Sequence, residues 1–327
     1  MIQPFFSIII LYWQNAQYLA ECLASLAAQS YQDFEIILLD NGSPQPLDPL
    51  LIASFPQLKF QMLTASKNLG FSAGNNLAVK SSLGEYLVFL NADAFPNPDW
   101  LEQIRSSILK FPRHFFASRL ISASDPAKLD GEWNVYHVSG LVWRKGHGHP
   151  VSKAKGSERE VFSACAAAGV YPRQAFELAG GFDEDFFAYM EDIDLDFRLQ
   201  LLGFHCRYLP QAKVRHVGSG STASRSELGV FHGHRNLPWV FLKDMPGIFF
   251  WIFLPCHLLA TLLYILAGLI FPTFHPVLSA KWQALKGLPL MLKKRHLVQA
   301  SKKVSSWQVV KKMDWNPFSP LTKLTFR

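Results

Sequence analysis

Short apolar runs alternate with helix-like segments along the first 110 residues, and this pattern limits the possible folds most strongly. The apolar runs lie at residues 6–11, 35–39, 58–63 and 85–90, and the helix-like segments at 18–28, 72–82 and 98–109. Such alternation is typical of proteins in which helices cover both faces of a parallel sheet. We therefore predict an α/β fold with a mainly parallel sheet flanked by helices.

The pattern is less regular after residue 110. Residues 191–202 predict an amphipathic helix, because Ile193, Phe197 and Leu201 fall on one face and Gly203 follows the last turn. Four shorter predictions complete this part: a polar, mobile loop at 152–160, a helix at 173–179 that ends at Gly180-Gly181, and strands at 207–210 and 213–216.

The composition sets broad limits on size and location. A length of 327 residues suits one large α/β domain with an appendage. The 49% hydrophobic and 17% charged residues predict a large core, a membrane-facing surface or both. The four cysteines form no CxxC pair, which indicates free thiols in a reducing compartment. The first residues lack the features of a secretory signal, so we expect the N-terminal part to stay in the cytoplasm.

Residues 247–271 contain no Asp, Glu, Lys or Arg. This run of 25 residues is long enough for a transmembrane helix. However, Pro255 and Pro272 divide off residues 256–271, which as a helix would measure about 24 Å against the ~30 Å core of a bilayer. We therefore favour a half-inserted hairpin or helices in the plane of the membrane, with a buried core helix as the alternative. Trp251, Trp282 and Trp307 suit positions at the interface.

The chain ends in a basic tail. Residues 281–327 hold 11 Lys and Arg and one acid, a charge of +10, which leaves 7 − 10 = −3 for residues 1–280. Such a tail suits anionic lipid or nucleic acid, and the apolar run before it favours lipid. Because basic segments prefer the cytoplasmic side, we predict association with the cytoplasmic face of the membrane and no binding to nucleic acid.

Acidic residues follow two of the predicted strands. Asp40 comes directly after the strand at 35–39, and Asp93 ends Asn91-Ala92-Asp93 after the strand at 85–90. Ligands of parallel sheets bind outside the carboxyl ends of the strands, so both acids should lie at one edge. A carboxylate there can bind Mg²⁺ or Mn²⁺ and a diphosphate. Each acid alone is equally compatible with a turn former.

Three further features carry possible chemistry. Asn68-Leu69-Gly70-Phe71 precedes a predicted helix and lets backbone N–H groups approach a ligand, but it matches neither GxGxxG nor a Walker loop. Glu191-Asp192 opens the helix at 191–202 just after several aromatic residues, which would raise the pKa of an acid toward that of a general base; acids in a first helical turn also stabilise the helix dipole. His216 is either a structural residue or an additional metal ligand.

Taken in order, these motifs resemble those of family 2 glycosyltransferases of the GT-A fold, in particular the rhamnosyltransferase-like branch. The resemblance covers roughly residues 5–245, and the run at 235–246 resembles the segment after the catalytic domain in membrane-associated members. The motifs that carry it are Asp40-Asn41-Gly42-Ser43, Asn68-Leu69-Gly70-Phe71 with Gly74-Asn75-Asn76, Leu90-Asn91-Ala92-Asp93, Gly180-Gly181-Phe182-Asp183-Glu184 and Glu191-Asp192-Ile193-Asp194-Leu195.

The resemblance implies a fold, a reaction and a location. It implies a GT-A-type mixed, mainly parallel sheet in a catalytic domain of residues 1–245, followed by membrane-associating apolar and amphipathic helices in residues 246–327. The implied reaction is inverting transfer of rhamnose or another hexose from a UDP- or dTDP-sugar to a hydroxyl of a cell-surface glycan or a lipid-linked precursor. The process would be biosynthesis of cell-envelope polysaccharide.

The resemblance also implies roles for single residues. Asp192 would be the catalytic base, with Glu191 beside it. Asp93 would bind the divalent cation, Mg²⁺ or Mn²⁺, with His216 as a late contact. Asn91 replaces the first acid of the DxD-type motif, which leaves one fewer carboxylate for the metal. The donor would be bound by Tyr12, Asp40, Asn68, Gly70 and Asn91.

Two other function classes fit the sequence less well. A sugar-1-phosphate nucleotidyltransferase has the same type of sheet but needs a glycine-rich, basic loop after the first strand, and residues 11–17 contain neither glycine nor a basic residue. A non-catalytic membrane scaffold has no need to keep Asp40, Asp93 and Asp192 together.

Overall fold

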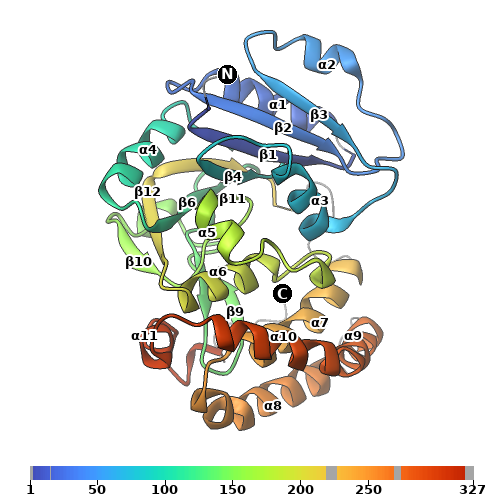
Figure 1. Cartoon of the computed structure of the whole chain (residues 1–327), viewed down its shortest axis with the longest axis vertical. Helices are drawn as coiled ribbons and strands as arrows, with labels where there is room; N and C mark the ends of the chain where they lie inside the picture. The colour runs from blue at the N-terminus through green and yellow to red at the C-terminus, as the bar shows by residue number, and fades with distance from the viewer. Residues whose placement is uncertain (1–2, 15, 219–226, 269–273, 321–327) are drawn as a thin grey trace.

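The computed structural model describes residues 3–14, 16–218, 227–268 and 274–320 (Figure 1). Several positions named above lie outside these described residues. They are residues 269–271 and Pro272 of the apolar run and the basic residues Lys323 and Arg327 of the tail.

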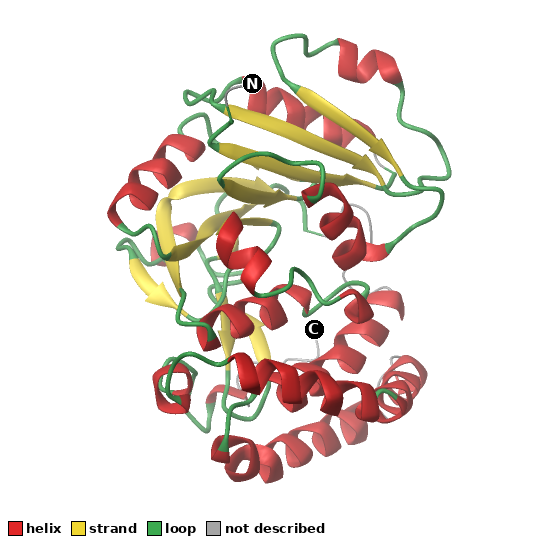
Figure 2. Ribbon diagram, in the orientation of Figure 1, coloured by secondary structure: helices red, strands yellow, loops and turns green. Residues whose placement is uncertain are grey.

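The core of the fold is a ten-stranded mixed sheet (Figure 2). Along its main path the strand order is β10-β12-β6-β11-β4-β1-β2-β3. The pairs β1–β2, β1–β4, β2–β3 and β6–β12 are parallel, whereas β11 runs antiparallel to its neighbours β4 and β6. The strands are β1 (Phe6–Tyr12), β2 (Phe34–Asp40), β3 (Phe60–Thr64), β4 (Tyr86–Leu90), β5 (Ala94–Pro96), β6 (His114–Ser122), β7 (Leu129–Gly131), β10 (Arg159–Val161), β11 (Ala168–Pro172) and β12 (His205–His216). A separate antiparallel pair consists of β8 (Asn134–Tyr136) and β9 (Val142–Arg144).

Each face of the sheet has its own core, because successive side chains of a strand point to opposite faces. On one face, Ile8 of β1 belongs to a cluster with residues of α1 (Ala16–Ala27) and α4 (Trp100–Lys110). On the other, Ile9 belongs to a cluster with residues of α3 (Gly70–Val79), α5 (Arg173–Leu178) and α6 (Glu191–Leu201). The predicted mixed, mainly parallel sheet flanked by helices is confirmed.

The C-terminal helices form the lower part of the molecule in Figures 1 and 2. A third core joins them to the sheet domain: it contains Phe186 and Phe197, but also Phe241, Phe250 and Met291. The helices are α7 (Glu227–Asp244), α8 (Ile248–Gly268), α9 (Phe274–Lys286), α10 (Leu288–Ser301) and α11 (Ser306–Val310). The shared core means that these helices pack as part of the fold rather than as a separate unit.

Three local predictions are corrected by the structure. The strands predicted at 207–210 and 213–216 are one strand, β12, with a register shift between Leu209 and Lys213. Pro210 lies in this shift, where its missing N–H interrupts the pairing. The loop predicted at 152–160 is bounded by a 3₁₀ turn, η1 (Val151–Lys153), and by β10.

The third correction concerns the apolar run. Pro255 does not divide it, because α8 continues through this residue for 21 residues, a length of about 32 Å. Phe253 before the proline and His257 after it are both buried against the rest of the protein. Contacts on both sides of Pro255 therefore keep the two halves on one helix.

The remaining short elements complete the chain between these parts. They are α2 (Pro49–Ala53), between β2 and β3, and the 3₁₀ turn η2 (Glu184–Phe186), shortly before α6.

Candidate functional site

A large cleft lies at the edge where the central parallel strands end. Its volume is about 1070 Å³, and its walls come from segments far apart in the sequence. Leu11 belongs to β1, Asp93 follows β4, and Gly70 opens α3. Glu191 opens α6 and His216 ends β12. This is the position at which open α/β sheets bind their ligands.

Asp93 and His216 meet in this cleft. Oδ1 of Asp93 lies 3.4 Å from Nε2 of His216, and Nδ2 of Asn91 lies 3.4 Å from the same nitrogen. The structure thus brings together three residues that the sequence predicted for the donor and metal site. Both Asp93 and His216 are buried.

Asp130 holds the other side of the imidazole ring. Its Oδ2 lies 2.8 Å from Nδ1 of His216 and 2.5 Å from Nη1 of Arg144. Burial alone would lower the pKa of His216, but the hydrogen bonds and charges of Asp130 and Asp93 raise it to about 9. Burial alone would raise the pKa of Asp130, but His216 and Arg144 lower it to about 2. An acid–histidine–acid chain results, with Nε2 directed toward Asp93.

The side chains at this position fit a divalent cation whose remaining ligands come from water and the substrate. Among the described residues, no group of three or more His, Cys, Asp or Glu side chains forms a cage for a metal ion. Asp93 and His216 offer one carboxylate and one imidazole side by side. Mg²⁺ is commonly held by one or two carboxylates, with waters and substrate phosphates as the other ligands. The two side chains therefore fit a metal–diphosphate site rather than a closed structural metal site.

The loop before α3 is held by two asparagines. Oδ1 of Asn68 accepts a hydrogen bond from Gly70 N at 2.8 Å, and Oδ1 of Asn41 accepts one from Leu69 N at 3.0 Å. The two side chains also contact each other, with Nδ2 of Asn41 3.3 Å from Oδ1 of Asn68. Asn68 and Gly70 were predicted for this wall. Asn41, which lines the cleft as well, was part of a motif but was not assigned a site role.

Tyr12 and Asp40 lie behind the wall of the cleft rather than on it. Their neighbours Leu11, Trp13 and Asn41 line it. Oδ1 of Asp40 accepts a hydrogen bond from Ser43 N at 2.9 Å, so this carboxylate holds the turn after β2. The proposed contact of Tyr12 and Asp40 with the donor stays a prediction.

Glu191 and Asp192 open α6 at the floor of the cleft and differ in their surroundings. Oδ2 of Asp192 accepts hydrogen bonds from Nδ2 of Asn134 at 3.2 Å and from Ala166 N at 3.3 Å. Burial raises the pKa of Asp192, and these donors oppose the rise. Oε2 of Glu191 is buried and has no hydrogen-bond partner among the described residues. Burial, followed by the charge of Asp192, raises the pKa of Glu191 well above its ordinary value.

The two acids therefore differ in how well their ionised forms are stabilised. Glu191 is buried beside the charge of Asp192, and a backbone hydrogen bond only partly opposes the resulting rise of its pKa. The ionised form of Asp192 is stabilised by an amide and a backbone N–H. Environments that separate the pKa values of two neighbouring acids are typical of sites that use one of them as a base.

Several residues of the cleft were not predicted from the sequence. Asp130, Asn134, Trp143 and Arg144 all line it and belong to the short strands β7, β8 and β9. Strands of three residues leave no readable periodicity, and Asp130-Gly131 resembles an ordinary hairpin turn. No signal in the single sequence separates these residues from other loop positions.

Known protein families and relatives match this chain over most of its length. Residues 86–283 match the family described as glycosyl transferase family group 2, and residues 7–162 match glycosyl transferase family 2. An N-acetylglucosaminyl-diphospho-decaprenol L-rhamnosyltransferase of Mycobacterium tuberculosis is 25% identical over 262 residues, which cover 72% of this chain and 83% of the relative. The O-antigen biosynthesis protein RfbC of Myxococcus xanthus is 29% identical over 67% of this chain but only 18% of its own length.

Solved structures resemble this chain as well. GalNAc-T7 with UDP, GalNAc and Mn²⁺ superposes with a TM-score of 0.60 at 15% identity, over 74% of this chain and 48% of that one. S. aureus TarS 1–349 in complex with UDP-GlcNAc superposes with a TM-score of 0.55 at 16% identity, over 94% and 88%. At such low identity the likeness concerns the fold, and it confirms the GT-A-type architecture.

Proposed function

This chain belongs to glycosyl transferase family 2, and from that premise we propose that it is an inverting hexosyltransferase of cell-envelope polysaccharide synthesis. Its donor is a UDP- or dTDP-sugar, and its acceptor is a hydroxyl of a glycan or a lipid-linked precursor. One observation carries the proposal: a single cleft holds the Asn91, Asp93 and His216 group together with the unequal acids Glu191 and Asp192. The relative that transfers rhamnose to N-acetylglucosaminyl-diphospho-decaprenol supports this choice of substrates.

Asp93 and His216 hold the diphosphate side of the site. Mg²⁺ or Mn²⁺, when bound there, supplies positive charge that stabilises the departing nucleoside diphosphate. Asp130 fixes the ring of His216 through Nδ1, and a cation bound at Nε2 would replace the proton that Nε2 otherwise shares with Asp93. The Mn²⁺ in the structure of GalNAc-T7 with UDP supports a divalent cation here.

Asn68 and Gly70 are proposed to line the donor pocket of this cleft. Tyr12 and Asp40 are proposed to contact the uracil or thymine nucleoside, because they adjoin Leu11 and Asn41 on the wall. Asn91, whose Nδ2 lies 3.4 Å from Nε2 of His216, is proposed to bind the donor beside the metal ligands.

Asp192 acts on the acceptor side. Its carboxylate takes the proton of the acceptor hydroxyl while the hydroxyl oxygen forms a bond to the anomeric carbon of the sugar. The bond between that carbon and the diphosphate oxygen breaks at the same time, so that the configuration inverts. The raised pKa of Glu191 next to it favours the protonated form, which adds no second negative charge near the diphosphate.

Donor binding tests this function directly. We expect at least one sugar nucleotide from a panel of UDP- and dTDP-sugars to bind the purified protein in the presence of Mn²⁺ or Mg²⁺, as measured by calorimetry. Asp93→Ala should weaken this binding about 10- to 100-fold, and chelation of the metal should remove the difference between variant and wild type. The matched control Asp99→Ala removes an exposed carboxylate at the start of α4 and should bind normally. Failure of every donor to bind would refute the proposed function.

The C-terminal helices are proposed to attach the enzyme to the membrane. Residues Ile248–Leu266 of α8 have a mean hydropathy of 2.1, and α8 is the one helix within the described ranges that is long and apolar enough to cross a bilayer. One side of α8 is fixed to the protein: His257 stacks on Phe241 at 4.2 Å between ring centres, and its Nδ1 lies 2.8 Å from the carbonyl oxygen of Ser139. A helix held in this way along the sheet domain supports an in-plane arrangement rather than a crossing.

The opposite side of these helices is an apolar surface that suits the interface of a membrane. We call it the apolar face, and its exposed residues are Ile248, Trp251, Ile252, Leu258, Leu259, Leu262, Leu263 and Leu266 of α8, Leu278, Trp282 and Leu285 of α9, and Trp307 of α11. Two lysines could contact anionic lipid beside this face: Lys286, which lies over the ring of Trp282, and Lys293, which is exposed. We therefore propose a catalytic part of residues 1–245 and a membrane-associating part of residues 246–327 that docks on the anionic cytoplasmic leaflet.

Membrane fractionation tests the apolar face. High salt alone is expected to leave the protein with the membranes, because the attachment depends mainly on apolar contacts. Leu259→Glu combined with Leu263→Glu should move most of the protein to the soluble fraction, since both side chains are exposed on α8. Leu109→Glu, at a leucine of α4 that is more exposed than either of these, is the control and should remain membrane-bound. Complete release of the wild type by salt would contradict insertion of the apolar face.

A further inference from the structure

The segment before the catalytic acids has an unusual backbone. Phe187, Tyr189 and Met190 have φ angles of 63°, 68° and 69°, in the left-handed region that disfavours side chains. Such residues are strained and persist only where neighbouring contacts hold them. Met190 is also the N-cap of α6 and makes no capping hydrogen bond with its side chain. The position of Glu191 therefore depends on whatever holds this segment, residues 186–190, which we call the catalytic turn.

Asn236 of α7 holds the catalytic turn through its side-chain amide. Its Nδ2 lies 2.9 Å from the carbonyl oxygens of Phe186 and Ala188 and 2.7 Å from that of Tyr189. One NH₂ group thus faces three carbonyl oxygens of the turn, so that one of its two N–H donors is shared between two of them, and the side chain is fully buried. Asn236 does not line the cleft, so it contacts the turn and not the substrate.

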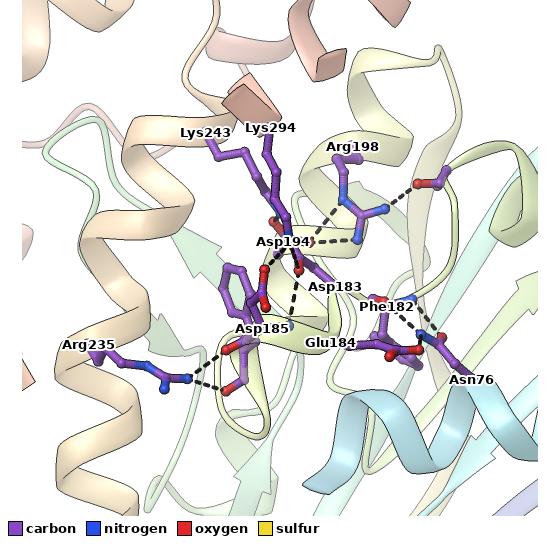
Figure 3. A network of polar contacts seen from close by, with 12 residues as sticks. Asn76, Phe182, Asp183, Glu184, Asp185, Asp194, Arg198, Arg235, Lys243 and Lys294 are labelled. Atoms are coloured by element: carbon purple, nitrogen blue, oxygen red, sulfur yellow. Dashed lines mark hydrogen bonds and ion pairs between the residues drawn. The ribbon is translucent and has the colours of Figure 1, made fainter. Parts of the chain in front are cut away.

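Arg235 fixes the orientation of that amide. Its Nε donates to Oδ1 of Asn236 at 2.8 Å, and because a guanidinium can only donate, the NH₂ group must face the turn. Nη2 of Arg235 also donates to the carbonyl oxygens of Asp185 and Phe186 at 2.9 and 2.8 Å. Figure 3 shows Arg235 reaching this part of the backbone from α7.

The catalytic turn also contacts the donor side of the cleft. The carbonyl oxygen of Phe187 accepts hydrogen bonds from Phe71 N at 2.6 Å and Ser72 N at 3.1 Å, in the first turn of α3. Gly70 is required beside it, since a Cβ there would lie 2.6 Å from the same oxygen. A displacement of the turn would therefore disturb both the acids and the loop that lines the donor pocket.

We propose that Asn236 is a positioning residue for glycosyl transfer. Its amide keeps the catalytic turn in the left-handed conformation, and this conformation positions both Asp192 and the start of α3 in one cleft. The proposal rests on the proposed role of Asp192 as the base, but it concerns the turn and can be tested without that role.

Asn236→Asp is the sharpest test, because it keeps the shape and replaces the donor with an oxygen that repels three carbonyl groups. We expect kcat to fall about 100-fold per folded molecule, since misplacing reacting groups by about 1 Å has an effect of that size. The KM for the donor should rise, and hydrogen exchange should become faster at the amides of Phe71 and Ser72. If this variant does not fold, Arg235→Lys, which removes the Nε contact, should show the same changes to a smaller extent.

Gln299→Ala is the matched control. Its side-chain amide also donates to backbone carbonyl oxygens of α7, those of Lys243 and Asp244, but far along the helix from the turn. Gln299→Ala should lose stability without a change in kcat or in exchange at Phe71 and Ser72. If Asn236→Asp or Arg235→Lys behaves like this control, the positioning role is refuted. Asp192→Asn should leave hydrogen exchange at Phe71 and Ser72 unchanged. If Asp192→Asn remained active, the assignment of Asp192 as the base would be refuted, but the role of Asn236 would not.

Discussion

Replacing Asp192 with asparagine is expected to lower kcat for sugar transfer by about 10²- to 10⁴-fold, the usual contribution of a general base. Donor binding should remain nearly unchanged. Asparagine preserves the size of the side chain and its contacts with Asn134 and Ala166, but it cannot accept the proton of the acceptor hydroxyl. Rapid-mixing kinetics with donor and acceptor, together with calorimetry of donor binding, would measure the two effects separately.

The pH dependence of kcat gives this prediction a second readout. Burial raises the pKa of Asp192 above its ordinary value of 3.8, and the base must be ionised to work. Activity should therefore be lost as the pH falls through the raised pKa, at a higher pH than for an exposed aspartate. Asp192→Asn should remove this acidic limb. Asp99→Asn, at the exposed N-cap of α4, should keep both the rate and the limb. Full activity of Asp192→Asn would show that another group is the base.

The parts of the fold that could be predicted depend on local sequence. The strands β1, β2 and β4 are continuous apolar runs, and a run of this kind must be buried wherever it occurs. Their order along the chain then places Asp93 at the carboxyl edge of the sheet. The predicted metal and donor residues Asn91, Asp93 and His216 do meet there.

The parts that could not be predicted depend on distant contacts. Asp130 reaches His216 across 86 positions of sequence, and Asn134 reaches Asp192 across 58. Neither contact leaves a periodic pattern near the residue itself. The prediction that Pro255 divides the apolar run was wrong. The local rule that proline interrupts a helix was overridden by the packing of Phe253 and His257 on either side of it.

The role of the charges in the basic tail could not be predicted from the sequence either. Its residues were predicted to face lipid, yet several are turned into the protein. Lys281 is buried and donates to the carbonyl oxygen of His234, Arg295 donates to those of Leu242 and Met245, and Lys294 pairs with Asp183 and Asp185. A count of charges along a sequence cannot separate cations that bind a membrane from cations that join helices to a domain.

Of these cations, Lys294 belongs to a buried ionic network that joins the C-terminal helices to the sheet domain (Figure 3). Lys243 of α7 lies between Asp183 and Asp194, with its Nζ 2.6 Å from Oδ2 of Asp183. Its side chain is 2% exposed and that of Asp194 is 0% exposed. Arg198 pairs with the other oxygen of Asp194 at 2.6 Å. Burial alone would raise the pKa of Asp183, but Lys243 and Lys294 hold it far below its ordinary value.

Lys243→Met is therefore expected to lower the free energy of unfolding by about 3–5 kcal/mol, because removal of one partner leaves a buried charge uncompensated. Methionine keeps the length of the side chain, so most of the loss should come from the charge. The control Arg215→Met breaks a pair with Glu21 in which both side chains are about half exposed, and should cost only about 0–1 kcal/mol. Urea unfolding in detergent would compare the two variants.

Adding Asp183→Asn to Lys243→Met should recover part of the loss, since it removes the carboxylate left with one partner fewer. Equal effects of Lys243→Met and Arg215→Met would mean that apolar packing of α7 and α10, and not this network, holds the C-terminal helices in place.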